Sequence, residues 1–288
     1  MAGTDLSLAL AATRPRFLTA SMLPVLAGSA WGVRFAGTVD VPALLLALAA
    51  TGLVHAASNV YNDVSDEQLG TDRANTTRIA PFTGGSRFIQ DGLLGVTDMR
   101  RLAGTLALLA VLAGALLAVR SGVAVLAFGL AGGLLGLAYS LPGVRLSGRG
   151  LGELAIAAAF GLLPVAGGFW LQSGVLGWPA LLLALPASAW VAAVILANEI
   201  PDAPSDGTTG KRTLAVRLGP RTPGLHGLIQ ALAFLGCGGL VAAGLVPAGA
   251  GRATGWSWRA AARGRRTGWT GRWRRCWAAT HRCSDRAP

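Results

Sequence analysis

Charged residues are scarce in this sequence of 288 residues, where Asp, Glu, Lys and Arg together make up only 13%. A soluble domain of this size carries about 25% charged residues, so the composition argues against a soluble enzyme. Cysteine is also rare, and the three cysteines show neither metal-ligand spacing nor a paired framework. The first 16 residues lack the basic start and the cleavage site of a signal peptide, so we expect them to be retained.

The sequence is instead rich in hydrophobic blocks. Hydrophobic residues make up 52% of the chain, and the blocks are about 20 residues long, the length of a helix that crosses a bilayer. All should be helices because lipid offers no partners to an open backbone, and Pro24, Pro164 and Pro186 are expected to kink theirs. The prediction is an all-α polytopic transmembrane bundle with seven spans: 17–36, 42–61, 101–119, 122–141, 153–172, 179–198 and 225–247.

The formal net charge of +12 is concentrated in one segment. Residues 251–288 hold ten arginines and five tryptophans, without a helical apolar stripe, so the charge does not indicate nucleic-acid binding. We divide the chain into a transmembrane domain, residues 1–250, and this atypical tail. Our hypothesis for the tail is an out-of-frame reading of the gene, which resequencing would test. The alternative is a basic segment that lies on anionic lipid.

Basic residues also indicate the orientation of the spans. They gather at the N-terminus and in the loops after the second, fourth and sixth spans, whereas the opposite side has only Arg34 and Arg120 before the tail. By the positive-inside rule the first group of segments is cytoplasmic. The two longest hydrophilic loops, 62–98 and 199–224, then face the cytoplasm together at the cell membrane.

The first of these loops begins with a cluster of polar residues. Asn59, Asn62, Asp63 and Asp66 are spaced three and four apart, so a helix that continues to Asp66 presents them on one face. Asp72 follows after Gly70, which can turn the chain.

The second loop contains a similar cluster with a basic pair behind it. Its residues are Asn198, Asp202 and Asp206, each four apart, followed by Lys211 and Arg212. Pro201 and Pro204 argue against an unbroken helix at this point, so the prediction of one shared face is weaker here.

Crowded carboxylates repel one another unless a cation lies between them. Oxygen ligands without His or Cys favour a hard cation such as Mg²⁺, which usually completes its shell with water and substrate phosphates. The two clusters therefore suit a diphosphate held through metal ions, with Arg212 as a bidentate clamp and Lys211 as a point charge. Solvated helix caps are the alternative for any one aspartate, but two such clusters on one side favour a site.

Four stretches in this order resemble the UbiA superfamily of intramembrane prenyltransferases, in its menaquinone-pathway branch. "NDVSDEQLGTD" and "NEIPDAPSDGTTGKRTLAVRLG" are similar to the two Asp-rich motifs of that branch. "YSLPGVRLSGRGLGE" resembles the loop between the fourth and fifth helices, and "TRPRFLTASMLPVLAG" the start of the first helix. The stretches span residues 13–219. Family members have nine spans, whereas this chain offers seven.

The resemblance implies a central cavity open to lipid and a Mg²⁺-dependent reaction. Mg²⁺ on Asp63, Asp66, Asp202 and Asp206 would hold a polyprenyl diphosphate and stabilise the departing diphosphate. The allylic cation would then attack an aromatic ring. The branch favours 1,4-dihydroxy-2-naphthoate as acceptor, with loss of its carboxylate, which gives demethylmenaquinone. The implied partners are these two substrates and membrane lipid, and no nucleic acid.

The same resemblance assigns substrate-binding or orienting roles to further residues, namely Asn59, Asn62, Asp72, Arg78, Tyr139, Asn198, Lys211 and Arg212. Alternatively, Tyr139 anchors the chain at the membrane interface. We interpret His55 as a packing or hydrogen-bonding residue rather than a base. The segment Gly84 to Arg87 shapes either a loop over the phosphates or a plain turn.

Two other kinds of function stay open on the sequence alone. A related prenyltransferase would use another acceptor, such as 4-hydroxybenzoate, homogentisate, haem or a glycerol phosphate. A cation or metabolite transporter would use the aspartates as an ion path, but no span has an acid near its centre. A phosphatidyltransferase of the CDP-alcohol type is disfavoured because its Asp-Gly-x-x-Ala-Arg signature is absent.

Overall fold

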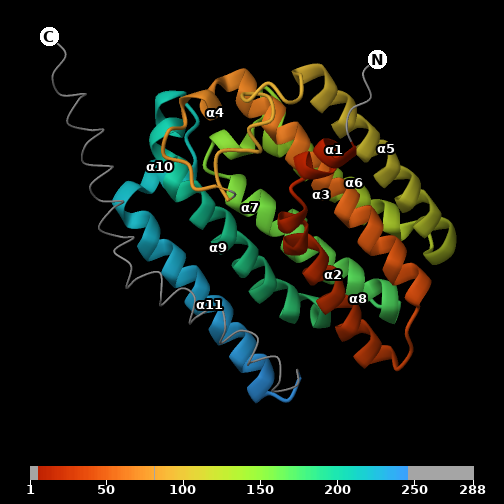
Figure 1. The fold of residues 1–288 in the computed structure, drawn as a ribbon. Coiled ribbons are helices and arrows are strands. Elements are labelled where there is room, and N and C mark those ends of the chain that lie inside the picture. The colour runs from red at the N-terminus through yellow and green to blue at the C-terminus, as the bar shows by residue number, and fades with distance from the viewer. Residues whose placement is uncertain (1–5, 81, 246–288) are drawn as a thin grey trace, which may run out of the picture.

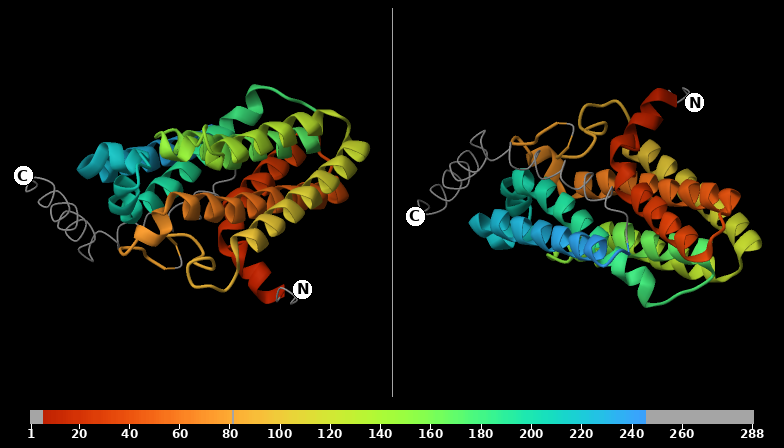
Figure 2. Two further views of the ribbon diagram at one scale, coloured as in Figure 1. Left: turned by 90° about the horizontal axis from the view of Figure 1, so that it is seen from above. Right: turned by 90° about the horizontal axis from the view of Figure 1, so that it is seen from below.

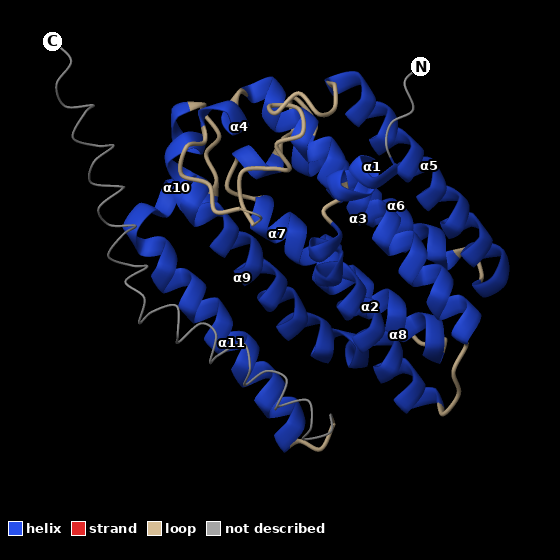
Figure 3. Ribbon diagram, viewed as in Figure 1, coloured by secondary structure: helices blue, strands red, loops and turns tan. Residues whose placement is uncertain are grey.

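The structure, a computed structural model, describes residues 6–80 and 82–245. Within these ranges the chain forms helices and loops and no strand (Figure 3). The Arg- and Trp-rich tail of residues 251–288 lies outside the described residues. The longer helices are α2 (Pro15–Ala36), α3 (Val41–Leu69), α5 (Val96–Ser121), α6 (Ala124–Ser140), α8 (Leu163–Ser173), α9 (Trp178–Thr208) and α11 (Thr222–Ala242). The short elements are α1 (Leu6–Ala12), α4 (Thr71–Ala74), η1 (Leu146–Gly148), α7 (Gly152–Ile156), η2 (Ala157–Leu162), α10 (Leu214–Leu218) and η3 (Gly219–Arg221).

Each of the seven predicted spans corresponds to a helix. Five helical stretches are long and apolar enough to cross a membrane: Val41–Leu69, Val96–Ser121, Gly152–Ser173, Trp178–Thr208 and Leu214–Ala242. Helix α6 is apolar but shorter, and α2 is not among the five. The predicted polytopic helical bundle is therefore confirmed, with two of its seven spans less typical than the sequence suggested.

The long helices run side by side in one bundle (Figure 1). Helix α5 forms one edge of the view and α11 the other, and the pairs α3 with α5, α2 with α8 and α9 with α11 make the main contacts. Two further views show the loop after α4 and helix α1 projecting from the same side of the bundle, toward one end (Figure 2). That end carries both polar clusters.

Glycines allow α2 and α8 to approach closely. A Cβ atom on Gly28 would lie 2.1 Å from the carbonyl oxygen of Val165, and one on Gly168 would lie 2.6 Å from that of Val25. Small residues permit such backbone contacts between membrane helices, where dispersion forces stabilise packing. The contact fixes α2, and the chain that precedes it, against the rest of the bundle.

The prolines interrupt these helices less than their sequence positions suggest. Helix α2 continues through Pro24, and α9 continues through Pro186. Pro164 is the second residue of α8, which begins after the π-helical turn Ala157–Leu162, an irregularity often found at functional sites. Membrane helices tolerate proline because neighbouring groups satisfy the freed carbonyl oxygens.

A cavity of about 890 Å³ lies between α3, α5, α6 and the helix Gly152–Ser173. Its lining is mostly alanine, glycine, leucine and valine, with Phe128, Phe160 and Trp170 among the larger side chains. The lining residues of α3, from Ala47 to Tyr61, lie on a different face of that helix from Asp63 and Asp66. The cavity therefore lies apart from the polar clusters.

Candidate functional site

The first polar cluster lies on the last three turns of α3. The helix continues to Leu69, which meets the condition for one shared face, and Gly70 ends it with φ of 75°. The N–H of Gly70 donates to the carbonyl oxygens of Asp66 and Glu67. Asp63 and Asp66 are only 2% and 7% exposed, so both carboxylates point into the protein.

The second cluster lies on α9, and here the expectation of a broken helix was wrong. Helix α9 runs without interruption through Pro201 and Pro204 to Thr208. Asn198, Asp202 and Asp206 therefore lie one turn apart on one face. A proline removes a single N–H donor, and the surrounding helices hold the rest of the turn in place.

The loop after α4 brings the two clusters together. The side-chain amide of Asn75 donates to Oδ1 of Asp202 at 2.7 Å, and the N–H of Gly84 donates to its Oδ2 at 3.0 Å. The N–H of Ser86 donates to Oδ2 of Asp63 at 3.2 Å. One loop thus contacts a carboxylate from each cluster, which favours a loop over the site rather than a plain turn.

Gly85 is the tightest point of this loop. Its φ is 69°, and a Cβ atom there would lie 2.5 Å from Oδ2 of Asp72 and 3.1 Å from Oδ1 of Asp63. Asp72 is 4% exposed. Burial, and then the nearby Asp66 carboxylate, raise the pKa of Asp72 to about 6. The loop therefore encloses an electrostatically crowded set of carboxylates.

Lys211 supplies a positive charge at the centre of the site. Its Nζ donates to both carboxylate oxygens of Asp66, at 3.2 and 3.1 Å, and lies 3.7 Å from Oδ1 of Asp206. Burial opposes the charged form, but the Asp66 and Asp206 carboxylates outweigh it and raise the pKa of Lys211 well above its ordinary value. One lysine thus joins an aspartate of each cluster.

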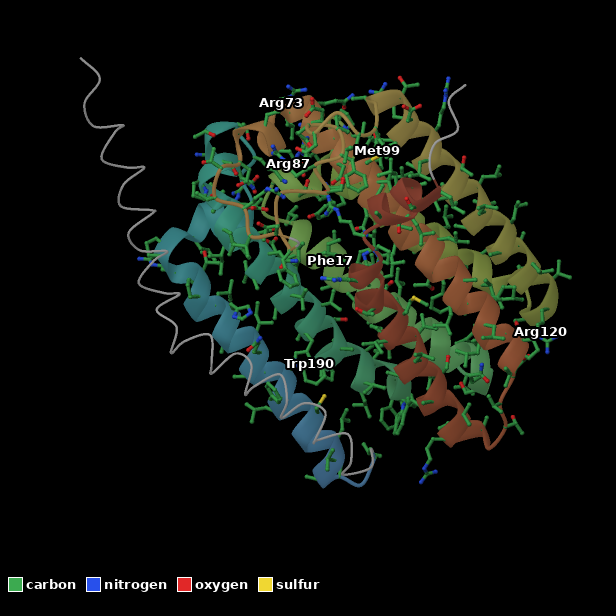
Figure 4. All side chains as sticks on the ribbon, in the orientation of Figure 1. Phe17, Arg73, Arg87, Met99, Arg120 and Trp190 are labelled. Atoms are coloured by element: carbon green, nitrogen blue, oxygen red, sulfur yellow. The ribbon has the colours of Figure 1, made fainter. Side chains whose placement is uncertain are left out.

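Two arginines that the sequence had not assigned to the site also contact it. Arg14, just before α2, forms an ion pair with Asp63. Burial lowers the pKa of Arg14, although the Asp72 and Asp66 carboxylates act in the opposite direction. Arg87 donates to the backbone carbonyl oxygen of Asp72, and Figure 4 shows it at the same end of the bundle as Arg73. Arg14 directly precedes an apolar span, and this position could have indicated a role in the site. We had interpreted it only as evidence for the orientation of the spans.

Asn59, Asn62 and Tyr139, all predicted site residues, contact neighbouring segments of the chain. The amide of Asn59 donates to the carbonyl oxygen of Thr13 at 3.0 Å, and that of Asn62 to Oγ of Ser140 at 3.3 Å. The ring of Tyr139 lies against Gly152. These contacts suit orienting roles, because they join α3 to the start of α2 and to the end of α6.

The other predicted residues lie at the edge or away from the carboxylates. Asn198 is half-buried on α9, whereas Arg78 and Arg212 are exposed. His55 contacts Ser21 Oγ through Nδ1 at 2.8 Å and stacks on Phe160. These contacts favour the interpretation of His55 as a packing and hydrogen-bonding residue.

Two buried glutamates beside the site were missed on the sequence. Glu153, at the start of α7, and Glu199, on α9, are 4% and 7% exposed. Oε1 of Glu153 accepts the N–H of Leu214 at 3.1 Å. Glu153 stands in the quoted loop motif and Glu199 beside Asn198, but neither has a spacing that indicates a buried position beside the site.

The site does not form a protein-only metal cage. Among the described residues, no three His, Cys, Asp or Glu side chains converge as such a cage requires. The set does fit Mg²⁺ shared with phosphate, because its ligands are all oxygen and Mg²⁺ needs only one or two carboxylates. Oδ2 of Asp72, buried and without a hydrogen-bond partner, marks a polar position that a cation would satisfy.

Comparison with known proteins gives consistent results. The 1,4-dihydroxy-2-naphthoate octaprenyltransferase of Escherichia coli is 33% identical over 215 residues, which cover 72% of this chain and 67% of the relative. The enzyme of the same name from Mycobacterium tuberculosis is 34% identical over 209 residues, covering 72% and 68%. The UbiA prenyltransferase domain-containing protein 1 of Danio rerio is 31% identical, covering 73% of this chain and 60% of its own. The chain thus spans about two thirds of the length of such relatives.

Solved structures show the same fold. A UbiA homologue from Archaeoglobus fulgidus, bound to DMAPP and Mg²⁺, superposes with a TM-score of 0.62 at 18% identity, covering 79% of this chain and 75% of that one. A structure concerned with digeranylgeranylglyceryl phosphate synthase has a TM-score of 0.57 at 17% identity, covering 83% and 78%. The family model described as the UbiA prenyltransferase family matches residues 21–279. The resemblance that the motifs predicted is confirmed, and this chain belongs to the UbiA prenyltransferase family.

Proposed function

We propose that this chain transfers a polyprenyl group from its diphosphate to 1,4-dihydroxy-2-naphthoate. The observation that carries the proposal is the joining of the two Asp clusters, on α3 and α9, by Lys211 and by the loop after α4. The acceptor is proposed from the relatives of that name, which are 33% and 34% identical to this chain. The reaction breaks the bond between the prenyl C1 and the diphosphate oxygen, and diphosphate departs with the electron pair.

The new bond joins prenyl C1 to the ring carbon that carries the carboxylate. That carboxylate leaves as CO₂ and returns its electron pair to the ring, so that atoms and charge balance. A site with little water protects the allylic cation from hydrolysis. Asp63, Asp66 and Asp72 lie in such a site, since each is less than a tenth exposed.

Both the carboxylates and the basic side chains of the site would contribute to binding the diphosphate. Asp63, Asp66, Asp202 and Asp206 would hold Mg²⁺, and Asp72 lies beside them. Bound Mg²⁺ would neutralise the charge that develops on the departing diphosphate. Lys211 and Arg14 already lie among these carboxylates and would contact phosphate oxygens. Arg78 and Arg212, exposed at the rim, would reach the diphosphate only after moving inward.

The chain is an integral membrane protein, and we propose that its site faces the cytoplasm. Arg73 lies in α4, and Arg78, Arg87, Arg145 and Arg149 lie in loops, all at the site end of the bundle. At the other end the described residues include only Arg34 and Arg120. By the positive-inside rule, this asymmetry supports a site on the inner side of the cell membrane.

The test is transfer from a radiolabelled prenyl diphosphate by the purified protein in lipid vesicles with Mg²⁺. We expect the naphthoate to be labelled, and 4-hydroxybenzoate and homogentisate not to be. Asp63→Asn should lower the rate more than about 100-fold, because even outer partners of metal ligands contribute 10- to 100-fold. Asp98→Asn, which alters an exposed helix cap at the same end, is the control. Equal rates for Asp63→Asn and wild type would contradict the proposal.

A further inference from the structure

The cavity between α3, α5, α6 and the helix Gly152–Ser173 has no part in the proposed reaction. Its volume of about 890 Å³ lies in the range of ligand sites, about 300–1,000 Å³. The diphosphate would bind among the aspartates, and Asp63 and Asp66 lie on a different face of α3 from the residues that line the cavity. Helix α3 thus separates the cavity from the place where the diphosphate would bind.

The polar groups of the cavity gather at its site end. Ser58 and Tyr61 of α3 and Arg100 of α5 line that end, and Thr51 and Trp170 apart, the rest of the lining consists of apolar residues and glycine. Figure 4 shows Met99, which precedes Arg100, at the end of the bundle that carries Arg73 and Arg87. The cavity is therefore polar near the membrane surface and apolar toward the bilayer centre, as an amphiphilic ligand requires.

Arg100 brings a positive charge without an acidic partner. Its side chain is exposed and forms no ion pair with another described residue, and the lining contains no Asp or Glu. A lipid phosphate would pair with Arg100, whereas the ammonium group of a zwitterionic headgroup would find no carboxylate in the lining. Basic pockets between membrane helices bind anionic headgroups in this way. The charge of the cavity thus fits an anionic lipid.

The cavity opens sideways, toward the lipid around the bundle. Val111 of α5 and Leu126, Leu130 and Leu134 of α6 all line it and yet are 50–66% exposed. Side chains that combine these two properties lie at the mouth of a cavity. In a membrane this mouth faces lipid tails, so a lipid can enter from the bilayer without crossing the protein.

Glycines provide the space inside the cavity. Gly104 and Gly114 of α5 and Gly133 of α6 line it, and nothing lies within 4 Å of a Cβ atom at any of the three positions. The lining of α5 extends from Arg100 to Leu117, about 25 Å along the helix. This length exceeds half of the hydrocarbon thickness, about 15 Å. The cavity can therefore accommodate an acyl chain of one leaflet.

We propose that this cavity binds one phospholipid with an anionic headgroup, taken from the leaflet at the site end. Its phosphate pairs with Arg100, and an acyl chain lies along α5 and α6, against α3. The lipid contacts none of the aspartates, so the inference goes beyond the proposed reaction and does not depend on it. The prenyl donor is also an anionic amphiphile, but its diphosphate would bind on the other face of α3.

Native mass spectrometry of the purified protein, titrated in detergent with phosphatidylglycerol or phosphatidylcholine, tests the headgroup contact. We expect the first phosphatidylglycerol to bind wild type more tightly than phosphatidylcholine does. Arg100→Gln should weaken its binding about five-fold, the scale of one basic residue at an anionic membrane surface. Arg101→Gln alters the adjacent exposed arginine outside the lining and is the matched control, with affinity within about two-fold of wild type. Equal affinities of the two lipids, or of wild type and Arg100→Gln, would overturn the headgroup contact.

A second pair of variants tests the cavity itself. Gly114→Leu places a side chain in the cavity and should abolish tight binding of phosphatidylglycerol. Gly227→Leu on α11 is the matched control, because its Cβ position is equally free of neighbours and lies outside the lining. Both substitutions favour helix. Wild-type binding in Gly114→Leu would place the lipid elsewhere and overturn the proposal.

The same titration distinguishes the phospholipid from the prenyl donor. A prenyl diphosphate, added with Mg²⁺, should leave phosphatidylglycerol bound. Its displacement would show that the cavity holds the tail of the donor, which would also overturn the proposal. Binding requires no prenyl transfer, so failure of the proposed function would leave these results unaffected. If Gly114→Leu does not accumulate in membranes, the comparison of Arg100→Gln with Arg101→Gln decides the matter.

Discussion

Gly85 shows how a single backbone position shapes the site. Its φ is 69°, and a Cβ atom at this position would lie only 2.5 Å from Oδ2 of Asp72. Any side chain at this position would strain the backbone and also displace the Asp72 carboxylate. The glycine lets the loop after α4 lie directly on the carboxylates.

Gly85→Ala is therefore expected to lower both stability and transfer activity. The left-handed conformation costs an L-residue about 1–2 kcal/mol, and movement of Asp72 adds a loss of activity. Gly92 has a φ of 68° in the same loop, with no atom within 4 Å of a Cβ position. Gly92→Ala should therefore lower stability only through the left-handed backbone conformation, without displacing a carboxylate. Thermal unfolding and transfer rates of the two variants, measured together, should show a large loss of activity only for Gly85→Ala; equal activity losses would contradict the crowding.

Helix α2 depends on glycine in a different way, through its packing on α8. A Cβ atom on Gly28 would approach the Val165 carbonyl oxygen to 2.1 Å, so the helices must separate to accommodate one. We expect Gly28→Ala to destabilise the protein by roughly 1–3 kcal/mol, the usual cost of overpacking.

Gly227→Ala on α11 is the control for that substitution, because nothing lies within 4 Å of its Cβ position. It should leave the unfolding temperature in detergent unchanged or slightly higher, since alanine favours helix over glycine. A similar loss in both variants would show that helix propensity, not the contact of α2 with α8, decides the effect.

The far ends of α3 and α5 are joined by an ion pair that should respond to pH. Arg120 donates to both carboxylate oxygens of Asp40, at 2.8 to 3.1 Å, and Asp40 caps α3 by accepting the N–H of Ala43. Figure 4 shows Arg120 at the opposite end of the bundle from Arg73 and Arg87. The Arg120 hydrogen bonds, then that of Ala43, lower the pKa of Asp40 below its ordinary value of 3.8.

Because the pKa of Asp40 is lower in the folded protein, its stabilising contribution is full above about pH 4 and is lost as pH falls through the folded value. Asp40→Asn should therefore unfold at a slightly lower temperature than wild type at pH 7. The two midpoints should converge as the pH falls through the lowered pKa of Asp40. A difference that persists unchanged in acid would show that the charge of Asp40 is not its cause.

At the scale of the whole molecule, the bundle has two chemically different ends. One carries the carboxylates, the loop after α4 and most of the arginines among the described residues, and the other carries short loops. Asp91 is exposed at the first end, and Val175 is exposed in the loop between α8 and α9 at the second.

Cysteines at these two positions test the proposed orientation. In a background without the native cysteines, a membrane-impermeant maleimide added to intact cells should modify Val175→Cys but not Asp91→Cys. Asp91→Cys should react once the membrane is permeabilised. The reverse pattern would place the site on the outer face and contradict the orientation that the arginines indicate.

Much of this protein follows from its sequence alone. Apolar blocks of about 20 residues determine the helices, because a backbone in lipid must satisfy its own hydrogen bonds. The spacing of Asp63 and Asp66 predicts that they share one helix face, and the two Asp-rich motifs already indicate the family. These features are local, so they can be read along the chain.

Only the tertiary structure decided which distant groups meet. The continuity of α9 through Pro201 and Pro204 depends on the helices around it, not on local propensity. The contacts of Lys211 with Asp66, of Arg14 with Asp63 and of Glu153 with the N–H of Leu214 join residues far apart in the chain. No spacing in the sequence encodes such contacts, because they arise when packed helices bring buried charges close enough to require partners.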